Sequence, residues 1–392
     1  MFTGGVAVGN VQPYFLTQAD VALDESRPLP EQPDLAAIED QALRMGEILA
    51  GFISAATTSL DIAIYDFRLL DGALTDQIVH AVQTAAGSGV NVRLAYDRTQ
   101  AAGAILKEFA DAGGDPAPTG THTFIATAGL PAGIQVQPIQ EEAINPGHQI
   151  MHQKYIVRDA GSPDAAVLMG SANFTTDAWG IQDNNVLVIT EAPELAAAYE
   201  QDFTDLWSSQ QLAGTGTGDV GSATVGGIGI GYSFAPGEGT QTEDDITDLI
   251  NAATARIRVA SMVISSGKIL QALADQIDRG LDVAGIYDGP QMANIAGQWQ
   301  QGGSGSVSEQ HLTLWRKISQ RLVAKASEPF TATGPHNFMH NKVVVADSTA
   351  STGSFNLSAN ATRNAENVLR ISSADLADQY ATYVDSLAQR YG

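Results

Sequence analysis

The chain of 392 residues contains no cysteine, which excludes disulfide bonds and thiolate metal ligands. It has no apolar run of about 18 residues, the minimum for a membrane-spanning helix, so we expect none. Its first residues, Met1-Phe2-Thr3-Gly4-Gly5, lack the basic and apolar segments of a signal peptide. The compartment stays open: the sequence fits a soluble protein that is cytoplasmic, or secreted after a signal has been removed.

Positive charge is also scarce. The chain has 20 Lys and Arg against 44 Asp and Glu, a net charge of −24. Such a surface repels phosphate backbones and weakens non-specific binding to nucleic acid, but it does not forbid a local basic patch. The one cluster, Arg316, Lys317, Arg321 and Lys325, is expected to be the solvated face of an amphipathic helix, with a phosphate-facing rim as the alternative.

What the chain does contain is a polar motif that occurs twice inside apolar runs. The first copy is His152-Gln153-Lys154, Asp159 and Gly170-Ser171-Ala172-Asn173. The second is His340-Asn341-Lys342, Asp347 and Gly353-Ser354-Phe355-Asn356. In both copies the Lys follows the His by two residues and the Asp follows the Lys by five. One copy would be a moderate signal, whereas two argue strongly against chance.

Hydrophobic periodicity predicts alternating helices and strands, which favours an α/β fold with a mainly parallel sheet. Strands are predicted at 11–16, 59–67, 90–96 and 185–190, and helices at 34–56, 74–86 and 194–209. Residues 113–147 are rich in Gly, Pro and Thr and are predicted to form loops over a site.

The flanking sequence repeats as well. Residues 53–63 match 250–260, 89–97 match 280–288, and 185–189 match 367–371. We therefore predict two duplicated α/β halves, 1–210 and 229–392, joined by a Gly/Ser/Thr-rich linker at 211–228. The halves are expected to pack about a pseudo-two-fold axis, so that one monomer builds one site from both.

On a strand, residues i and i+2 share a face, so each motif His points the same way as its Lys. The interface would then collect two His, two Lys, two Asn and two Ser. Imidazole supplies a nucleophile or a proton carrier, while Lys and Asn donate hydrogen bonds to a negative centre. No carboxylate cage accompanies them, so we expect a phosphate site that uses no metal and no other cofactor.

At these residues the chain resembles the phospholipase D superfamily, whose signature is His-x-Lys-x4-Asp with a downstream Gly-Ser-x-Asn. The resemblance implies a phosphodiesterase with a phosphohistidine intermediate, one His as nucleophile and the other as general acid. Carried onto this chain, it implies His152 as the nucleophile and His340 as the acid, with Lys154, Lys342, Asn173 and Asn356 on the phosphate oxygens. Asp159 and Asp347 would support the site, although capping of a turn is an equal alternative.

The family's acidic residue that orients a His matches Glu366, but the aligned position in the first half is Asn184, with Asp183 beside it. The two halves are therefore not expected to be equivalent.

Other recurring residues are assigned less directly. Ser171 and Ser354 are expected to contact substrate. His148 and His336 each precede a motif His by four residues, and lining of the substrate entrance is favoured over metal binding. Trp179 and Trp315 are expected in the core or in a groove wall.

Four functions remain in competition. A phospholipase D-type enzyme would hydrolyse phospholipid headgroups at a membrane surface, or transfer them to an alcohol. The acidic charge favours this function, and so do the apolar residues in the loops before each motif. These loop residues are Phe124, Ile125, Leu130, Ile134, Phe330 and Phe338. A metal-independent nuclease is favoured by the stretch 353–358 with Glu366, which resembles the nuclease branch. A phosphatidyl transferase such as cardiolipin synthase is disfavoured because no membrane anchor is expected, and a non-enzymatic binding module is the last alternative.

Overall fold

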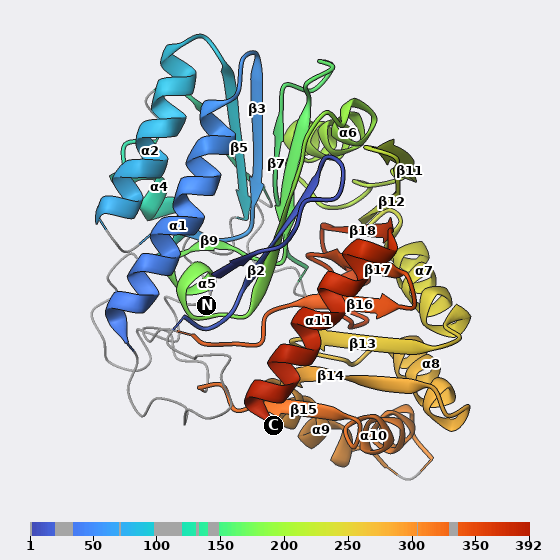
Figure 1. Cartoon of the computed structure of the whole chain (residues 1–392). Coiled ribbons are helices and arrows are strands. Elements are labelled where there is room, and N and C mark those ends of the chain that lie inside the picture. The colour runs from blue at the N-terminus through green and yellow to red at the C-terminus, as the bar shows by residue number, and fades with distance from the viewer. Residues whose placement is uncertain are drawn as a thin grey trace.

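The computed structural model describes residues 2–19, 34–69, 72–97, 120–130, 133–139, 149–303, 305–328 and 336–392. It is a mixed α/β structure with two eight-stranded sheets flanked by helices. In Figure 1 most strands of the first half, blue to green, lie above those of the second half, yellow to red, while β11 and β12 of the second half lie at the upper right beside α6. The N-terminus lies beside α5 and β2, and the C-terminus lies at the end of α11 beside β15.

The first sheet has the strand order β1-β2-β10-β8-β7-β3-β5-β6. The pairs from β1 to β3 along this order are antiparallel, and β3–β5 and β5–β6 are parallel. Its strands are β1 (Phe2–Gly4), β2 (Val11–Leu16), β3 (Ser59–Ile64), β5 (Asn91–Asp97), β6 (Gln135–Ile139), β7 (Lys154–Arg158), β8 (Ala166–Gly170) and β10 (Asn184–Ile189).

The second sheet repeats this order and these directions as β11-β12-β18-β17-β16-β13-β14-β15. Its strands are β11 (Val220–Val225), β12 (Ile228–Ala235), β13 (Arg256–Ser261), β14 (Asp282–Asp288), β15 (Leu322–Lys325), β16 (Lys342–Ala346), β17 (Thr349–Gly353) and β18 (Glu366–Ser372). Strand for strand, the second half reproduces the first, which confirms the predicted duplication.

The α/β class is also confirmed, but the sheets are mixed rather than mainly parallel. Each motif strand, β7 or β16, turns back directly into β8 or β17, and such a short connection permits only antiparallel pairing. A two-stranded sheet of β4 (Phe67–Arg68) and β9 (Phe174–Thr175) completes the strands of the described residues.

The helices that were predicted in the first half are present, with ends shifted by one or two residues. Asp34 caps the first of them, its side chain accepting hydrogen bonds from the backbone of Ala36 and Ala37. The helices are α1 (Leu35–Ser54), α2 (Gly72–Gly87), α4 (Thr121–Thr127), α5 (Thr176–Gly180), α6 (Pro193–Ser209), α7 (Gly239–Ala252), α8 (Gly267–Asp278), α9 (Gly289–Gln300), α10 (Val307–Ile318), α11 (Ala374–Tyr391) and the 3-10 turn η2 (Ala361–Arg363).

Three apolar cores stabilise the fold. One lies between the first sheet and α1, α2 and α5, and another between the second sheet and α7, α8 and α10. The third contains residues of both sheets together with α6 and α11, so it joins the halves. Within it Phe15 of β2 stacks on Tyr383 of α11, with 4.7 Å between the ring centroids. Burial of this shared core fixes the two halves against each other.

The segment 211–228, predicted as a linker, is not wholly a connection. Strand β11 lies within it and pairs along its length with β12 in the second sheet. The division at 210 and 229 stays a prediction. Within the described ranges, no helix is long and apolar enough to cross a membrane.

Candidate active site

The two motif strands approach each other end to end at the interface between the halves. Two short parallel bridges join the halves there, Met151 with Ala365 and Met339 with Asp183. The backbone N–H of His152 donates to the carbonyl of Ala365 at 2.9 Å, and that of His340 donates to the carbonyl of Asp183 at 3.0 Å. Each motif His is therefore anchored to the opposite half.

The imidazole side chains of His152 and His340 also contact residues of the opposite half. Nδ1 of His152 lies 2.8 Å from Oε2 and 3.0 Å from Oε1 of Glu366, which belongs to the second half. Nδ1 of His340 lies 3.0 Å from Oδ1 of Asn184, which belongs to the first half. One His thus has a carboxyl partner and the other a carboxamide partner.

The orientation of the Asn184 amide follows from its other contacts. Its Nδ2 donates to the carbonyl of Ala178 at 3.1 Å and to Oε1 of Gln182 at 3.3 Å, so its Oδ1 faces His340. Nδ1 of His340 must then carry the proton, which leaves Nε2 free for chemistry. A carboxylate at position 184 would face the Ala178 carbonyl with no hydrogen to donate, which accounts for Asn at this position.

Burial dominates the electrostatics of the cluster. Loss of hydration lowers the pKa of His152 and of His340 well below its usual value, and the two lysines lower it further. Burial raises the pKa of Glu366 to about 8. The carboxyl therefore ionises close to neutral pH, and in its ionised form it can accept the Nδ1–H of His152, which leaves Nε2 of that imidazole unprotonated.

The two lysines also lie inside the cluster. Burial lowers the pKa of Lys154 to about 7 and that of Lys342 well below its ordinary value, with the charge of Lys154 adding to the effect on Lys342. Lys154 Nζ donates to the carbonyl of His152 at 2.8 Å. Two buried amines that repel each other would be stabilised by a bound anion.

Asn173 and Asn356 occupy matching positions after β8 and β17. The buried Oδ1 atom of each has no hydrogen-bond partner among the described residues. An amide oxygen only accepts, so a phosphate oxygen would have to be bound by the Nδ2 group of each side chain.

A second set of polar contacts, which the sequence did not reveal, lies on the opposite face of the motif strands. Asn367 Nδ2 donates to Gln153 Oε1 at 2.6 Å, and Asn185 Nδ2 donates to Asn341 Oδ1 at 2.9 Å. Gln153 also donates to the buried Asp202 at 3.1 Å. The residue between each His and Lys therefore fixes the motif strand to the other half.

Asp97 and Asp288, at the ends of β5 and β14, were also missed as site residues, although both recur in the sequence repeat. Each buried carboxylate accepts a hydrogen bond from the backbone N–H directly before a motif His, at Met151 or Met339. They fix the backbone just before each motif His. Their recurrence in both copies of the repeat could have identified them from the sequence.

Asp159 and Asp347 lie elsewhere. Each follows the last residues of a motif strand, at the end away from the His, with a positive φ of 53° or 51°. Asp159 accepts hydrogen bonds from the backbone of residues 57–59, and Asp347 from that of residues 254–256. The structure does not bring them to the histidines, so of the two alternatives it favours the turn-capping role.

The motif serines are occupied by the protein. Ser171 Oγ donates to Asn184 Oδ1 at 2.8 Å, and Ser354 hydrogen-bonds to Glu366, which lowers the pKa of that carboxyl against the larger effect of burial. Both therefore orient the partners of the histidines instead of facing a ligand. His336 lies 3.7 Å from the Asp177 carboxylate, while His148 lies outside the described residues.

One member of the predicted basic cluster is not on a solvated face. Arg316 is exposed and Lys317 pairs with Asp278 on the surface, as expected. Lys325, however, is buried on β15 and forms an ion pair with the buried Asp183 at 2.6 Å. This pair crosses the interface beside Asn184, and its counterparts in the other copy are the apolar Ile139 and Ala365.

We expect Lys325→Ile and Asp183→Ala each to lower the free energy of unfolding by about 3–5 kcal/mol, because each leaves a buried charge unpaired. The double variant, which copies the apolar pair of the other half, should recover most of the loss, though not the contact of the Gln18 N–H with Asp183. Urea denaturation of the three variants and the wild type measures this. Additive losses in the double variant would show that the two charges do not interact.

The apolar loop residues do not form an exposed surface. Ile125 and Leu130 are buried in the first core, Phe124 packs against Phe67 with 5.0 Å between centroids, and Ile134 packs against the same core. Phe338 is buried, and Phe330 lies outside the described residues. Burial or packing of the described side chains therefore removes this argument for a lipid substrate. Trp179 and Trp315 are core residues.

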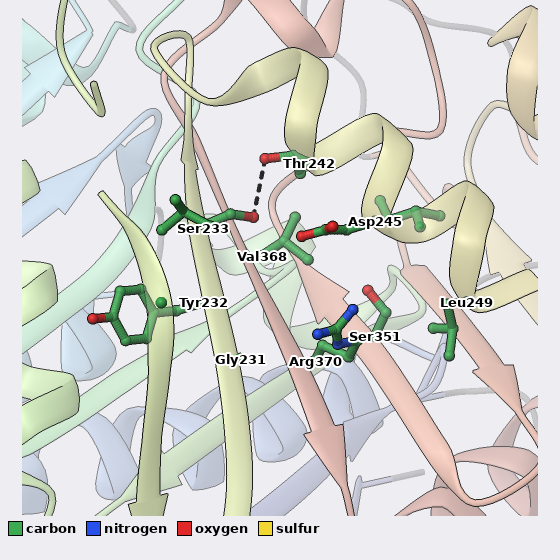
Figure 2. A pocket seen from close by; sticks show the side chains of 12 residues that line it. Gly231, Tyr232, Ser233, Thr242, Asp245, Leu249, Ser351, Val368 and Arg370 are labelled. Carbon is green, nitrogen blue, oxygen red and sulfur yellow. Dashed lines mark hydrogen bonds between the residues drawn. The ribbon is translucent and has the colours of Figure 1, made fainter. Parts of the chain in front are cut away.

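A small cavity of about 80 Å³ lies apart from the histidines, between β11, β12, β18 and α7 (Figure 2). Thr242 donates to Ser233 across it at 3.0 Å, and Asp245 and Arg370 line it. Its volume suits a few water molecules, and none of the His, Lys or Asn side chains of the motifs lines it.

Comparison with known proteins agrees with the duplicated fold. The domain family described as cardiolipin synthase, PLD-like domain matches residues 49–207 and 246–388, which include both motifs. The chain belongs to the phospholipase D superfamily. No curated protein sequence matches it. Superfamily membership supports a phosphodiesterase or a phospholipid-modifying enzyme.

Solved structures are similar to this superfamily member in fold. Phosphatidylserine synthase from Haemophilus influenzae is 14% identical, with a TM-score of 0.61, over 89% of this chain and 85% of its own. Polyphosphate kinase from Porphyromonas gingivalis is 12% identical, with a TM-score of 0.52, over 89% of this chain and 48% of its own. Nuc from Salmonella typhimurium is 24% identical over 41% of this chain and 94% of its own, with a TM-score of 0.30, too low to carry an argument.

Proposed function

We propose that this chain is a metal-independent phosphodiesterase that works through a phosphohistidine on His152 and acts on phospholipid headgroups. The observation that carries the proposal is the exchange of partners between the halves, His152 with Glu366 and His340 with Asn184. It supports one site with two histidines in different environments, as nucleophilic attack and proton donation require.

In the first step, Nε2 of His152 attacks the phosphorus and the bond to the leaving alcohol breaks. His340, protonated on Nε2, gives its proton to the departing oxygen. In the second step, His340 takes a proton from water, or from an acceptor alcohol, whose oxygen displaces His152. Hydrolysis and transfer to an alcohol differ only in the molecule that enters at this step.

The unlike partners support this division of roles. A carboxylate on Nδ1 makes an imidazole more basic and stabilises the positive charge of a phosphohistidine, which suits His152 as the nucleophile. A neutral amide stabilises an imidazolium less, so His340 is the stronger acid. Lys154, Lys342, Asn173 and Asn356 would hold the non-bridging oxygens and neutralise the charge of the transition state.

Charge supports a lipid over a nucleic acid as substrate. A protein with a net charge of −24 gains little from counterion release along a polymer of phosphates. A phospholipid presents one phosphodiester, which the lysines and asparagines can neutralise locally. Contact with a membrane or micelle surface would be peripheral under this proposal.

With excess EDTA present, we expect the purified protein to hydrolyse bis-p-nitrophenyl phosphate and ethanolamine phospholipid in mixed micelles. Its lysines and asparagines supply the charge stabilisation that two-metal enzymes take from cations. With ethanol added, a phosphatidylethanol product should appear, and single-stranded DNA should be cut more slowly at moderate salt. Mass spectrometry of lipid products and gel analysis of DNA measure both.

Loss of bis-p-nitrophenyl phosphate hydrolysis in EDTA, restored by a divalent ion, would contradict the metal-independent mechanism. Cutting of DNA without any lipid product would instead make the enzyme a nuclease. If Arg316→Glu with Lys317→Glu then abolished the cutting, the exposed end of α10 would be the nucleic-acid contact.

A further inference from the structure

The surroundings of the catalytic cluster differ between the two copies. In the first half the segment after β3 carries Tyr65, Asp66 and Arg68. Tyr65 N–H donates to the carbonyl of Gln153, and in the second half Met262 N–H donates to that of Asn341, so these segments occupy equivalent places. The counterparts of Tyr65, Asp66 and Arg68 are Met262, Val263 and Ser265, which carry no charge.

The first-half residues form a connected row of charges that starts at the site. Tyr65 contacts the His152 ring edge to face, with 5.1 Å between centroids, and Lys154 Nζ lies 5.1 Å from the centre of the Tyr65 ring. The charge of Asp66 acts on Lys154 and raises its pKa against the larger effect of burial. Asp66 in turn holds Arg68 through two hydrogen bonds of 2.7 and 2.6 Å.

The row ends beside the segment that carries His340. Asp177 of α5 acts electrostatically on Arg68 and accepts the backbone N–H of His336 at 3.3 Å. His336 comes four residues before His340, and α5 directly precedes the segment with Asn184, the partner of His340. The counterpart of Asp177 in the second half is the neutral Asn360.

Two groups in this row remain available to a ligand. Arg68 uses Nε and Nη2 on Asp66, and its Nη1 has no hydrogen-bond partner among the described residues; about 30% of its side chain is exposed. Asp177 uses Oδ2 on His336, and within the same ranges its Oδ1 has none. One donor of Arg68 and one carboxylate oxygen of Asp177 are thus not used within the described residues, in the row that ends at the segment carrying His340.

We propose, on the basis of the proposed function, that Arg68 and Asp177 form the subsite for the polar alcohol of the substrate. Asp177 would accept from an amine or hydroxyl of that alcohol, and Arg68 would donate to an oxygen on it. The alcohol enters and leaves beside His340, so one subsite serves the leaving headgroup and the acceptor in transfer. The uncharged counterparts leave the other side of the phosphate to the apolar part of the substrate.

The test compares two substrates in two variants. Asp177→Asn keeps the acceptor for His336 but removes the charge, and it should lower kcat/KM for ethanolamine phospholipid about tenfold or more, mainly through KM, as expected for one charge-assisted hydrogen bond. Hydrolysis of bis-p-nitrophenyl phosphate, which has no polar alcohol, should change less than about twofold. Arg68→Lys keeps the charge beside Asp66. It should likewise lower kcat/KM for a phospholipid with a glycerol headgroup and change the hydrolysis of bis-p-nitrophenyl phosphate much less. Asp282→Asn, on the exposed surface of β14, is the matched control and should change neither substrate.

Equal losses on both substrates, or no loss on either, would overturn the subsite while leaving the phosphodiesterase intact. So would a wild-type protein that hydrolyses bis-p-nitrophenyl phosphate but shows no preference for an ester with a polar headgroup. A wild type that turns over neither substrate would overturn the proposed function, and the subsite with it.

Discussion

Replacing either His152 or His340 by alanine is expected to lower turnover of an alkyl phosphodiester by about 10³-fold or more, because nucleophilic attack and proton donation are separate tasks in one site. The two variants should differ on an activated ester. With p-nitrophenolate as the leaving group little proton donation is needed, so His340→Ala should retain measurable hydrolysis of bis-p-nitrophenyl phosphate while His152→Ala retains none. Steady-state kinetics on both substrates measure the difference.

Both histidines are buried, so His152→Asn and His340→Asn, which fill more of the space, serve as second variants for folding. Two variants that each keep half of the activity would indicate two independent sites and contradict the shared one. If His152→Ala were the variant that retained hydrolysis of the activated ester, the roles of the two histidines would be reversed.

Glu366→Gln is expected to lower kcat by about 10²-fold or more, because the positive phosphohistidine on His152 loses its carboxylate. With a pKa raised to about 8, Glu366 should also give the rate an ionisation near that pH, which the Gln variant lacks. The pH dependence of kcat and kcat/KM checks both effects. Asn184→Ala is the matched control: it removes the partner of His340 without removing a charge, so it should lower the rate less and keep the ionisation.

The carboxyl of Glu366 also makes the free energy of unfolding depend on pH. Folded protein holds a proton on Glu366 up to about pH 8, whereas the unfolded chain releases it near the ordinary value of 4.5. The contribution of Glu366 to the free energy of unfolding is therefore present at low pH and is lost as the pH rises through this interval. A Gln variant whose unfolding shows the same pH dependence as the wild type would contradict the raised pKa.

The repeat made the halves and their shared cluster predictable, because the same residues recur in the same order in both copies and indicate the same succession of strands. The direction of those strands was not predictable from alternation of helices and strands, since it depends on the tight turns at Asp159 and Asp347. The buried position of Lys325 was missed because its partner, Asp183, is 142 residues away. An ion pair between two segments that are far apart in the sequence produces no periodic pattern in the sequence of either segment.

The exchange of contacts between the halves also bears on how the protein becomes active. Neither half alone holds a His together with its Nδ1 partner, since Glu366 and Asn184 each serve the imidazole of the other copy. A half that had folded by itself would expose its Gln153 or Asn341 and part of the shared core, and it would have no catalytic activity. During refolding, catalytic activity should appear only when the two halves dock. It should therefore recover later than the spectroscopic signal of the helices.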